Sequence, residues 1–135
     1  MQRAEIIANL TRALTRRPGI LVAYLFGSVA RDEARPSSDV DVGVVLEQGP
    51  LRDLPALIEY GHLQSDLQEL VEPMVDLVVL NDAPPELVYR AIRDGVVLAE
   101  KSALERALFE LRARNEYFDL QPMLELYRRT VLGKT

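Results

Sequence analysis

The sequence predicts one compact α/β domain that ends in a helical extension. With 135 residues, of which 48% are hydrophobic, the chain has a common single-domain length and enough apolar side chains for a core. Helical and strand periodicities alternate through residues 1–99, whereas residues 100–135 show helical periodicity only. We therefore expect a single domain over 1–135, with its functional core at 1–99 and its helical extension at 100–135.

The first half of the chain predicts two helices and two strands. Residues 3–16 predict a helix, and residues 20–26 form a continuous apolar run that is typical of a strand covered on both faces. Residues 28–34 predict a short helix that begins at Ser28, and residues 40–46 predict a strand rich in β-branched side chains. The apolar positions of the first helix are Ile6, Ile7, Leu10, Ala13 and Leu14.

The second half continues the alternation. Residues 52–71 predict a long helix that Pro73 ends, and residues 75–80 predict a third strand. The next helix begins at Pro84-Pro85, because proline is tolerated in a first turn, and stops at Gly95 before a short strand at 96–99.

The extension is expected to contain two helices. Residues 102–118 form the first, residues 119–122 interrupt it at Pro122, and residues 123–132 form the second. We expect the apolar stripe of the first helix to cover the sheet. The second is apolar on more than one side, which favours contact with a partner or another subunit. The stripe consists of Leu104, Leu108, Leu111 and Phe118.

Composition excludes several classes of protein. The net charge of −5 argues against a dedicated nucleic-acid binder, which normally carries a basic surface. The absence of cysteine excludes disulfides and thiolate metal sites. No apolar run approaches the ~20 residues that span a bilayer, and acidic Glu5 in an amphipathic N-terminus is unlike a signal peptide. We expect a soluble cytoplasmic protein with no membrane partner and no direct nucleic-acid partner.

Gly27 and Ser28 stand where the first strand ends. Glycine permits a tight turn there, and a helix that opens at serine presents free backbone N–H groups and a hydroxyl, which suit a phosphate. The same two residues also fit an ordinary helix N-cap.

Asp39 and Asp41 lie two residues apart at the start of the second strand. Alternate strand residues share a face, so the two carboxylates should lie side by side and repel each other unless a cation binds between them. Hard oxygen ligands of this kind suit Mg²⁺. A solvated Asp-x-Asp turn is the alternative.

Asp76 is a carboxylate within the third, otherwise apolar strand, between Val75 and Leu77, which should face away from it. Such a group is costly to bury unless it is paired or binds a metal, and an exposed strand start is the alternative. A phosphate-binding turn, two aligned carboxylates and a third on a nearby strand together describe a two-metal phosphoryl-transfer site.

Ten residues separate Gly27-Ser28 from Asp39-Val40-Asp41, and with this spacing the chain resembles the minimal nucleotidyltransferases of the DNA polymerase β superfamily. The surrounding pattern of Ala30, Arg31, Arg35 and Ser38 is also typical of that family. Segment 100–122 is similar to the tails of antitoxin members that are encoded beside HEPN-domain toxins.

The resemblance implies a polymerase β-type nucleotidyltransferase fold, with a mixed sheet of three to four strands flanked by helices. It implies ATP as the donor, Mg²⁺ held by the catalytic carboxylates, and a nucleotide-binding set at the Gly-Ser turn and the loop after it. By this resemblance the catalytic and metal-binding residues are Asp39, Asp41 and Asp76. The nucleotide-binding residues are Gly27, Ser28, Arg31, Arg35 and Ser38. Arginine forks suit phosphate oxygens, although Arg31 could instead pair with a neighbouring acid on its helix.

The resemblance further implies an antitoxin that transfers AMP to a tyrosine of a HEPN-type ribonuclease. The chain is too short for a separate acceptor domain, so the acceptor should arrive on another protein, or a second subunit of a homo-oligomer should complete its pocket. Two alternatives stay open: a nucleotidyltransferase that modifies a small molecule such as an antibiotic, and a non-catalytic antitoxin that acts by binding alone.

Overall fold

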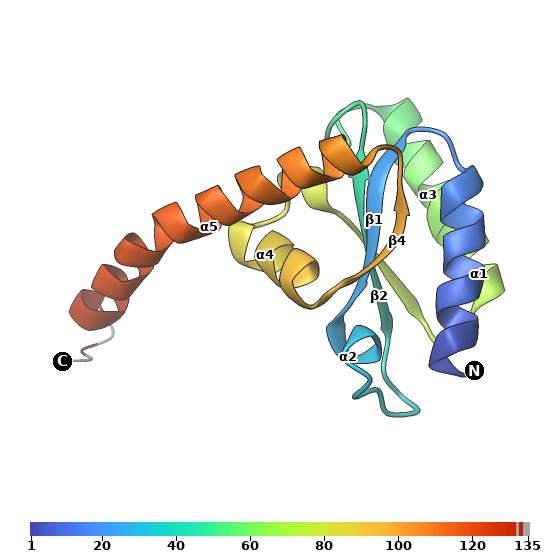
Figure 1. Cartoon of the computed structure of the whole chain (residues 1–135), viewed down its shortest axis with the longest axis horizontal. Helices are drawn as coiled ribbons and strands as arrows, with labels where there is room; N and C mark the ends of the chain where they lie inside the picture. The colour runs from blue at the N-terminus through green and yellow to red at the C-terminus, as the bar shows by residue number, and fades with distance from the viewer. Residues whose placement is uncertain (132, 134–135) are drawn as a thin grey trace.

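A mixed four-stranded sheet with strand order β3-β2-β1-β4 forms the centre of the computed structural model, which describes residues 1–131 and 133 (Figure 1). Its strands are β1 (Ile20–Phe26), β2 (Val40–Leu46), β3 (Val75–Val79) and β4 (Val96–Glu100). β1 pairs antiparallel with β2 and β4, and β2 runs parallel to β3. The expected α/β class with a mixed sheet is confirmed.

Helices cover both faces of this sheet. α1 (Arg3–Arg16) and α3 (Leu54–Leu70) lie on one face, and α4 (Pro85–Asp94) and α5 (Ala103–Val131) lie on the other (Figure 1). A 3₁₀ turn, η1 (Leu80–Asp82), connects β3 to α4. No helix within the described residues is both long enough and apolar enough to cross a membrane.

The alternation of side chains along the strands divides the core into two layers. On β1, Ala23 and Leu25 pack with the α1 and α3 layer, while Tyr24 and Phe26 pack with the α4 and α5 layer. On β2, the valines on either side of Asp41 belong to the α1 and α3 layer, so Asp41 itself faces α4. This periodicity decides which side of the sheet carries the polar groups.

Helix α2 is shorter than the sequence predicts. It spans Gly27–Ala30 rather than residues 28–34. Asp32 adopts a left-handed backbone conformation with φ 59°, which no α-helix can continue through. Glu33 still donates its backbone N–H to the carbonyl of Ser28 at 2.8 Å, so the segment folds back over the short helix.

The C-terminal extension is one continuous helix, so the expected break at residues 119–122 is wrong. α5 runs through Pro122 in the chain's last third (Figure 1). A single proline removes one backbone donor from a helix without necessarily ending it, and the neighbours Leu120 and Gln121 are good helix formers. Residue 132, which the prediction included in the last helix, lies outside the described residues.

The face of α5 that meets the sheet is also different from the expected one. Ala113 is buried there, and Tyr24 on β1 donates its hydroxyl to Glu110 at 2.8 Å. Arg106 also donates to Glu110, at 3.3 Å. Because a polar network as well as apolar contact fixes this face, the apolar stripe turns outward. Its side chains are 49–70% exposed: Leu104, Leu108, Leu111 and Phe118.

Candidate active site

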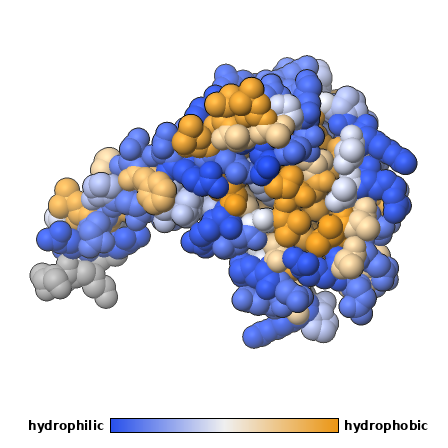
Figure 2. All heavy atoms as spheres, in the orientation of Figure 1, coloured by the Kyte–Doolittle hydropathy of each residue, from blue (hydrophilic) through white to orange (hydrophobic). Residues whose placement is uncertain are grey.

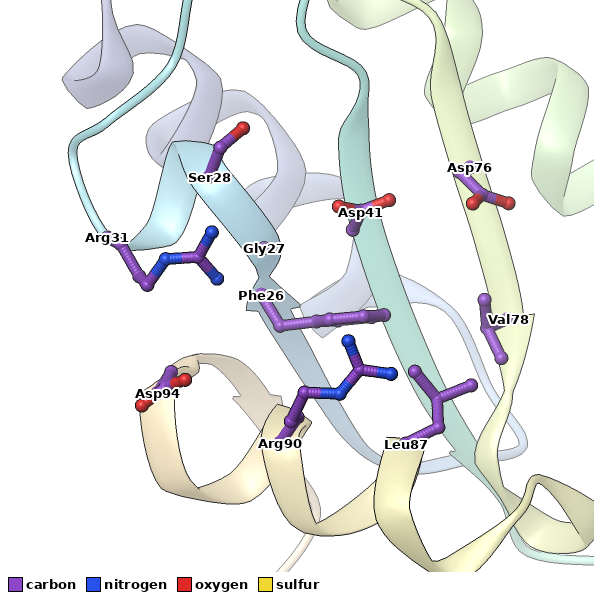
Figure 3. A pocket seen from close by; sticks show the side chains of 10 residues that line it. All are labelled: Phe26, Gly27, Ser28, Arg31, Asp41, Asp76, Val78, Leu87, Arg90 and Asp94. Carbon is purple, nitrogen blue, oxygen red and sulfur yellow. The ribbon is translucent and has the colours of Figure 1, made fainter. Parts of the chain in front are cut away.

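An open cleft of about 360 Å³ lies between the end of the sheet and helix α4 (Figure 3). Three elements form it: the turn into α2, the facing ends of β2 and β3, and one side of α4. The lining residues are Phe26, Gly27, Ser28, Arg31, Asp41, Asp76, Val78, Leu87, Arg90 and Asp94.

Asp41 and Asp76 are direct neighbours across the parallel pair of β2 and β3. Both side chains project into the cleft, because the alternation that buries Val75 and Leu77 on one face turns Asp76 to the other (Figure 3). That orientation was predicted. The expected burial of Asp76 is wrong: the residue is exposed and Asp41 is half-buried, because the strand ends open into the cleft here.

Gly27 lies against the Asp41 carboxylate. Phe26 pairs with Asp41 in the β1–β2 ladder, so the turn that follows β1 passes directly beside this side chain. Gly27 has φ +74°, and a Cβ atom at this position would sit 2.0 Å from Oδ2 of Asp41. Only glycine satisfies both the left-handed backbone and this contact. The Gly-Ser pair is therefore part of the carboxylate site; it is not the alternative helix N-cap, because the cap residue of α2 is Phe26 and no side chain caps this helix.

The electrostatics of the cleft disfavour two free carboxylates. Burial, together with the charges of Asp76 and Asp39, raises the pKa of Asp41 from 3.8 to about 6. Such a pair of hard oxygen donors fits a divalent cation, whose charge would remove the repulsion. The donor set is therefore suited to the divalent metal that nucleotidyltransferases use.

Asp39 is placed differently from the other two acids. It precedes the first residue of β2, is exposed, and does not line the cleft. Within residues 1–131 and 133, no three acidic or histidine side chains converge closely enough to hold one metal ion. Asp39 acts on the site here through its charge, which contributes to the raised pKa of Asp41.

The two arginines that follow the Gly-Ser pair occupy different positions relative to the cleft. Arg31 lines the cleft, and its Nε donates to Glu33 at 3.2 Å, so the pair with a neighbouring acid is observed and the contact with phosphate stays a prediction. Arg35 is exposed outside the cleft, and its backbone N–H donates to the hydroxyl of Ser38 at 2.8 Å. In this conformation Arg35 and Ser38 shape the loop before β2 rather than the cleft wall.

Arg3 holds the short helix α2 in place through two hydrogen bonds. Its Nε donates to the carbonyl of Val29 at 3.0 Å, and its Nη2 donates to the carbonyl of Ala30 at 2.9 Å. These are carbonyls at the end of α2, which a four-residue helix cannot satisfy internally. The guanidinium thus fixes the position of α2, and with it Ser28. Nothing in the local sequence around Arg3 signals this long-range contact.

Sequence reasoning also missed the contribution of α4. Leu87, Arg90 and Asp94 face the cleft together with Phe26 (Figure 3). Their spacing of three and four residues does place them on one side of a helix. The sequence offers no indication that this side of α4, rather than another, meets the ends of β1 and β2.

Comparison with known proteins agrees with this geometry. The family model for polymerase beta nucleotidyltransferases matches residues 8–104, which include every residue that lines the cleft. Protein adenylyltransferase MntA of Thermococcus cleftensis is 31% identical over 92 residues, which are 68% of this chain and 88% of that protein.

Solved structures extend the likeness to the whole chain. One chain, from a toxin–antitoxin complex with AMP-PNP, is 26% identical with a TM-score of 0.70, covering 98% of this chain and 97% of that one. Another, an MNT antitoxin in complex with the tri-AMPylated HEPN toxin of Shewanella oneidensis, shares the fold at 23% identity, with a TM-score of 0.66 over 95% of this chain and 96% of that one. The chain described here belongs to the polymerase beta nucleotidyltransferase family.

Proposed function

We propose that this protein is a Mg²⁺-dependent protein adenylyltransferase, an antitoxin that transfers AMP from ATP to a tyrosine hydroxyl of a HEPN-type ribonuclease toxin. The observation that carries the proposal is the contact between Gly27 and Asp41 beside Asp76, which brings the Gly-Ser turn and two carboxylates into one cleft. The likeness to MntA and to the AMP-PNP-bound toxin–antitoxin chain supports protein AMPylation as the reaction.

Different residues of the cleft would bind the phosphates of the donor ATP and the metal ion. The N–H groups and hydroxyl at Ser28, together with the Arg31 guanidinium, would hold phosphate oxygens of ATP. Asp41 and Asp76 would hold Mg²⁺, with Asp39 as a third ligand that its exposed position leaves free to turn toward the site. Bound there, Mg²⁺ would supply charge neutralisation for the phosphates and the leaving group.

The reaction would be an in-line displacement at the α-phosphorus. The tyrosine oxygen forms a bond to the α-phosphorus while the bond to the bridging oxygen of the β-phosphate breaks, and pyrophosphate leaves. Asp76 is suited to accept the hydroxyl proton, because it is exposed at the mouth of the cleft and adjacent to Asp41.

The acceptor side of the cleft is open, which suits an acceptor presented by another protein in the cytoplasm. Helix α5 extends beyond the sheet and carries apolar side chains on its outward side (Figures 1 and 2). Exposed apolar residues at this density mark contact surfaces. We propose that they contact the toxin; those in the last turns of the helix are Met123, Leu126, Tyr127 and Val131.

Transfer of the α-phosphoryl group can be measured directly. The protein would be incubated with Mg²⁺, the HEPN protein encoded beside it, and ATP labelled at either the α- or the γ-phosphate. We expect label on the HEPN protein from α-labelled ATP only, and none with the Asp41→Asn variant. Label from γ-labelled ATP would indicate a kinase instead. An unlabelled HEPN protein that is nevertheless inhibited would indicate an antitoxin that acts by binding alone.

A further inference from the structure

Arg90 is a cationic side chain that lines the cleft but belongs neither to the Gly-Ser motif nor to the set of carboxylates. It lies on the side of α4 that faces the strand ends, one turn after Leu87 and one turn before Asp94 (Figure 3). An adjacent side of α4 packs into the core and fixes the rotation of the helix. The buried residues of that side are Val88, Ala91 and Ile92.

The guanidinium donors of Arg90 have no partner in the part of the chain that the structure describes. Among residues 1–131 and 133, no side chain or carbonyl forms a hydrogen bond or ion pair with the guanidinium of Arg90. The nearest acid on the same face, Asp94, is already engaged by Arg93 through two hydrogen bonds of 3.0 and 2.8 Å. Arg90 therefore keeps a full set of N–H donors directed at the cleft.

The position of Arg90 is opposite the turn that begins α2. Ser28 and Arg31 form one wall, Arg90 forms the facing wall on α4, and Asp41 and Asp76 lie beside these walls on β2 and β3 (Figure 3). A polyanion bound to metal at the two carboxylates would lie between two guanidinium groups. Guanidinium forks bind phosphate oxygens in a bidentate manner and so fix orientation as well as charge.

We propose that Arg90 binds a phosphate group of the donor nucleotide from the α4 side of the cleft. This inference rests on the proposed function, since it assigns a further contact for the same donor. Arg90 is thus a substrate-binding residue, and it makes α4 the second wall of the triphosphate site. A hydrogen-bonded charge pair of this kind contributes about 10- to 100-fold in affinity.

The test measures binding without turnover, by titration calorimetry in the presence of Mg²⁺. The two ligands are a non-hydrolysable ATP analogue and inorganic tripolyphosphate, which has no base or ribose. We expect Arg90→Gln to weaken both ligands by about 10- to 100-fold, and Arg90→Lys to weaken them less because it keeps the charge but loses the fork. Arg12→Gln removes the same charge from an exposed site on α1, outside the cleft, and should bind both ligands like the wild type.

Three outcomes would overturn the proposal. If Arg90→Gln binds both ligands like the wild type, Arg90 is not a ligand contact. If only the ATP analogue is weakened and tripolyphosphate is not, Arg90 contacts the nucleoside instead of a phosphate. If the wild type binds neither ligand, the proposed function fails as well. Thermal unfolding of each variant checks the fold, which should be unchanged because Arg90 is exposed and unpaired among the described residues.

Discussion

Gly27 and Asp41 meet so closely that a single added methyl group would lie 2.0 Å from the Asp41 carboxylate oxygen. This contact joins the end of β1 to the start of β2 across the antiparallel ladder. The Gly-Ser turn and the Asp41 carboxylate are therefore one structural unit. A change at either residue should displace the other.

We expect Gly27→Ala to abolish AMP transfer. A displacement of about 1 Å at a reacting group commonly costs 10²-fold, so the rate should fall by at least about that factor. Gly19→Ala is the matched control, because Gly19 also has a positive φ of +86° but has no atom within 4 Å of its would-be Cβ. Both variants lose stability from backbone strain, and only Gly27→Ala should lose transfer. Equal activities of the two variants would show that the contact has no role in the reaction.

Arg3→Gln should raise the KM for ATP, because it removes both hydrogen bonds that hold the carbonyls of Val29 and Ala30. We expect a rise of about 5- to 20-fold with a smaller change in kcat, since Arg3 positions the turn and does not touch the reacting atoms. Arg3→Lys should recover part of the loss. An unchanged KM with only a lower melting temperature would assign Arg3 a purely structural role.

The Asp41 carboxyl should titrate near pH 6 in the metal-free protein, because burial and the nearby acids raise its pKa from 3.8 to about 6. The folded state then binds more protons than the unfolded state between these values, so this group costs stability as the pH rises through that window, and the cost persists above it. Removing the charge with Asp41→Asn should raise the melting temperature of the metal-free protein at pH 7.5 and have little effect below pH 4.

Carbon-detected NMR of the Asp41 carboxyl, recorded in chelator across pH 4 to 8, would measure this titration. A midpoint near 4 would contradict the electrostatic account of the cleft. Metal binding should release this proton, so divalent-metal affinity should fall as the pH drops below about 6.

Tyr24→Phe should loosen helix α5. The variant removes the hydroxyl that donates to Glu110 at 2.8 Å, in a side chain that is 1% exposed. We expect a loss of about 1 kcal/mol in unfolding free energy and faster amide exchange in the first half of α5. Tyr127→Phe, at a position 55% exposed on the same helix, is the control and should change neither quantity. If both variants behave alike, the hydroxyl of Tyr24 does not anchor the helix.

The sequence was sufficient to predict the central strands, because the periodicities that indicate them are local. The continuous apolar run of β1 and the β-branched run of β2 each predict a strand with the observed bounds, Ile20–Phe26 and Val40–Leu46. A strand carrying Asp76 near Asp41 could be anticipated as well, but their direct pairing in register could not. The combined spacing of the Gly-Ser turn and the three aspartates indicates the fold more specifically than any one of these features alone.

The sequence did not predict the features that depend on tertiary contacts between elements. Pro122 suggested a break that the helix formers around it prevent, and the apolar stripe suggested the wrong contact face for α5 because a polar network holds the other face. The contributions of Arg3 and Arg90 depend on how helices far apart in the chain are oriented around the strand ends. The catalytic, metal-binding and nucleotide-binding roles of the predicted site residues all stay predictions, and Asp39, Arg35 and Ser38 also lie outside the cleft lining.

The most direct test of the central claim is the state of the toxin after it has been separated from this protein. The HEPN toxin would be incubated with the protein, ATP and Mg²⁺, purified away under denaturing conditions, refolded, and examined by peptide mass spectrometry and a ribonuclease assay. We predict AMP on a tyrosine and a lasting loss of ribonuclease activity, with neither seen when Asp41→Asn replaces the wild type. An unmodified toxin that regains full ribonuclease activity after separation would contradict the account.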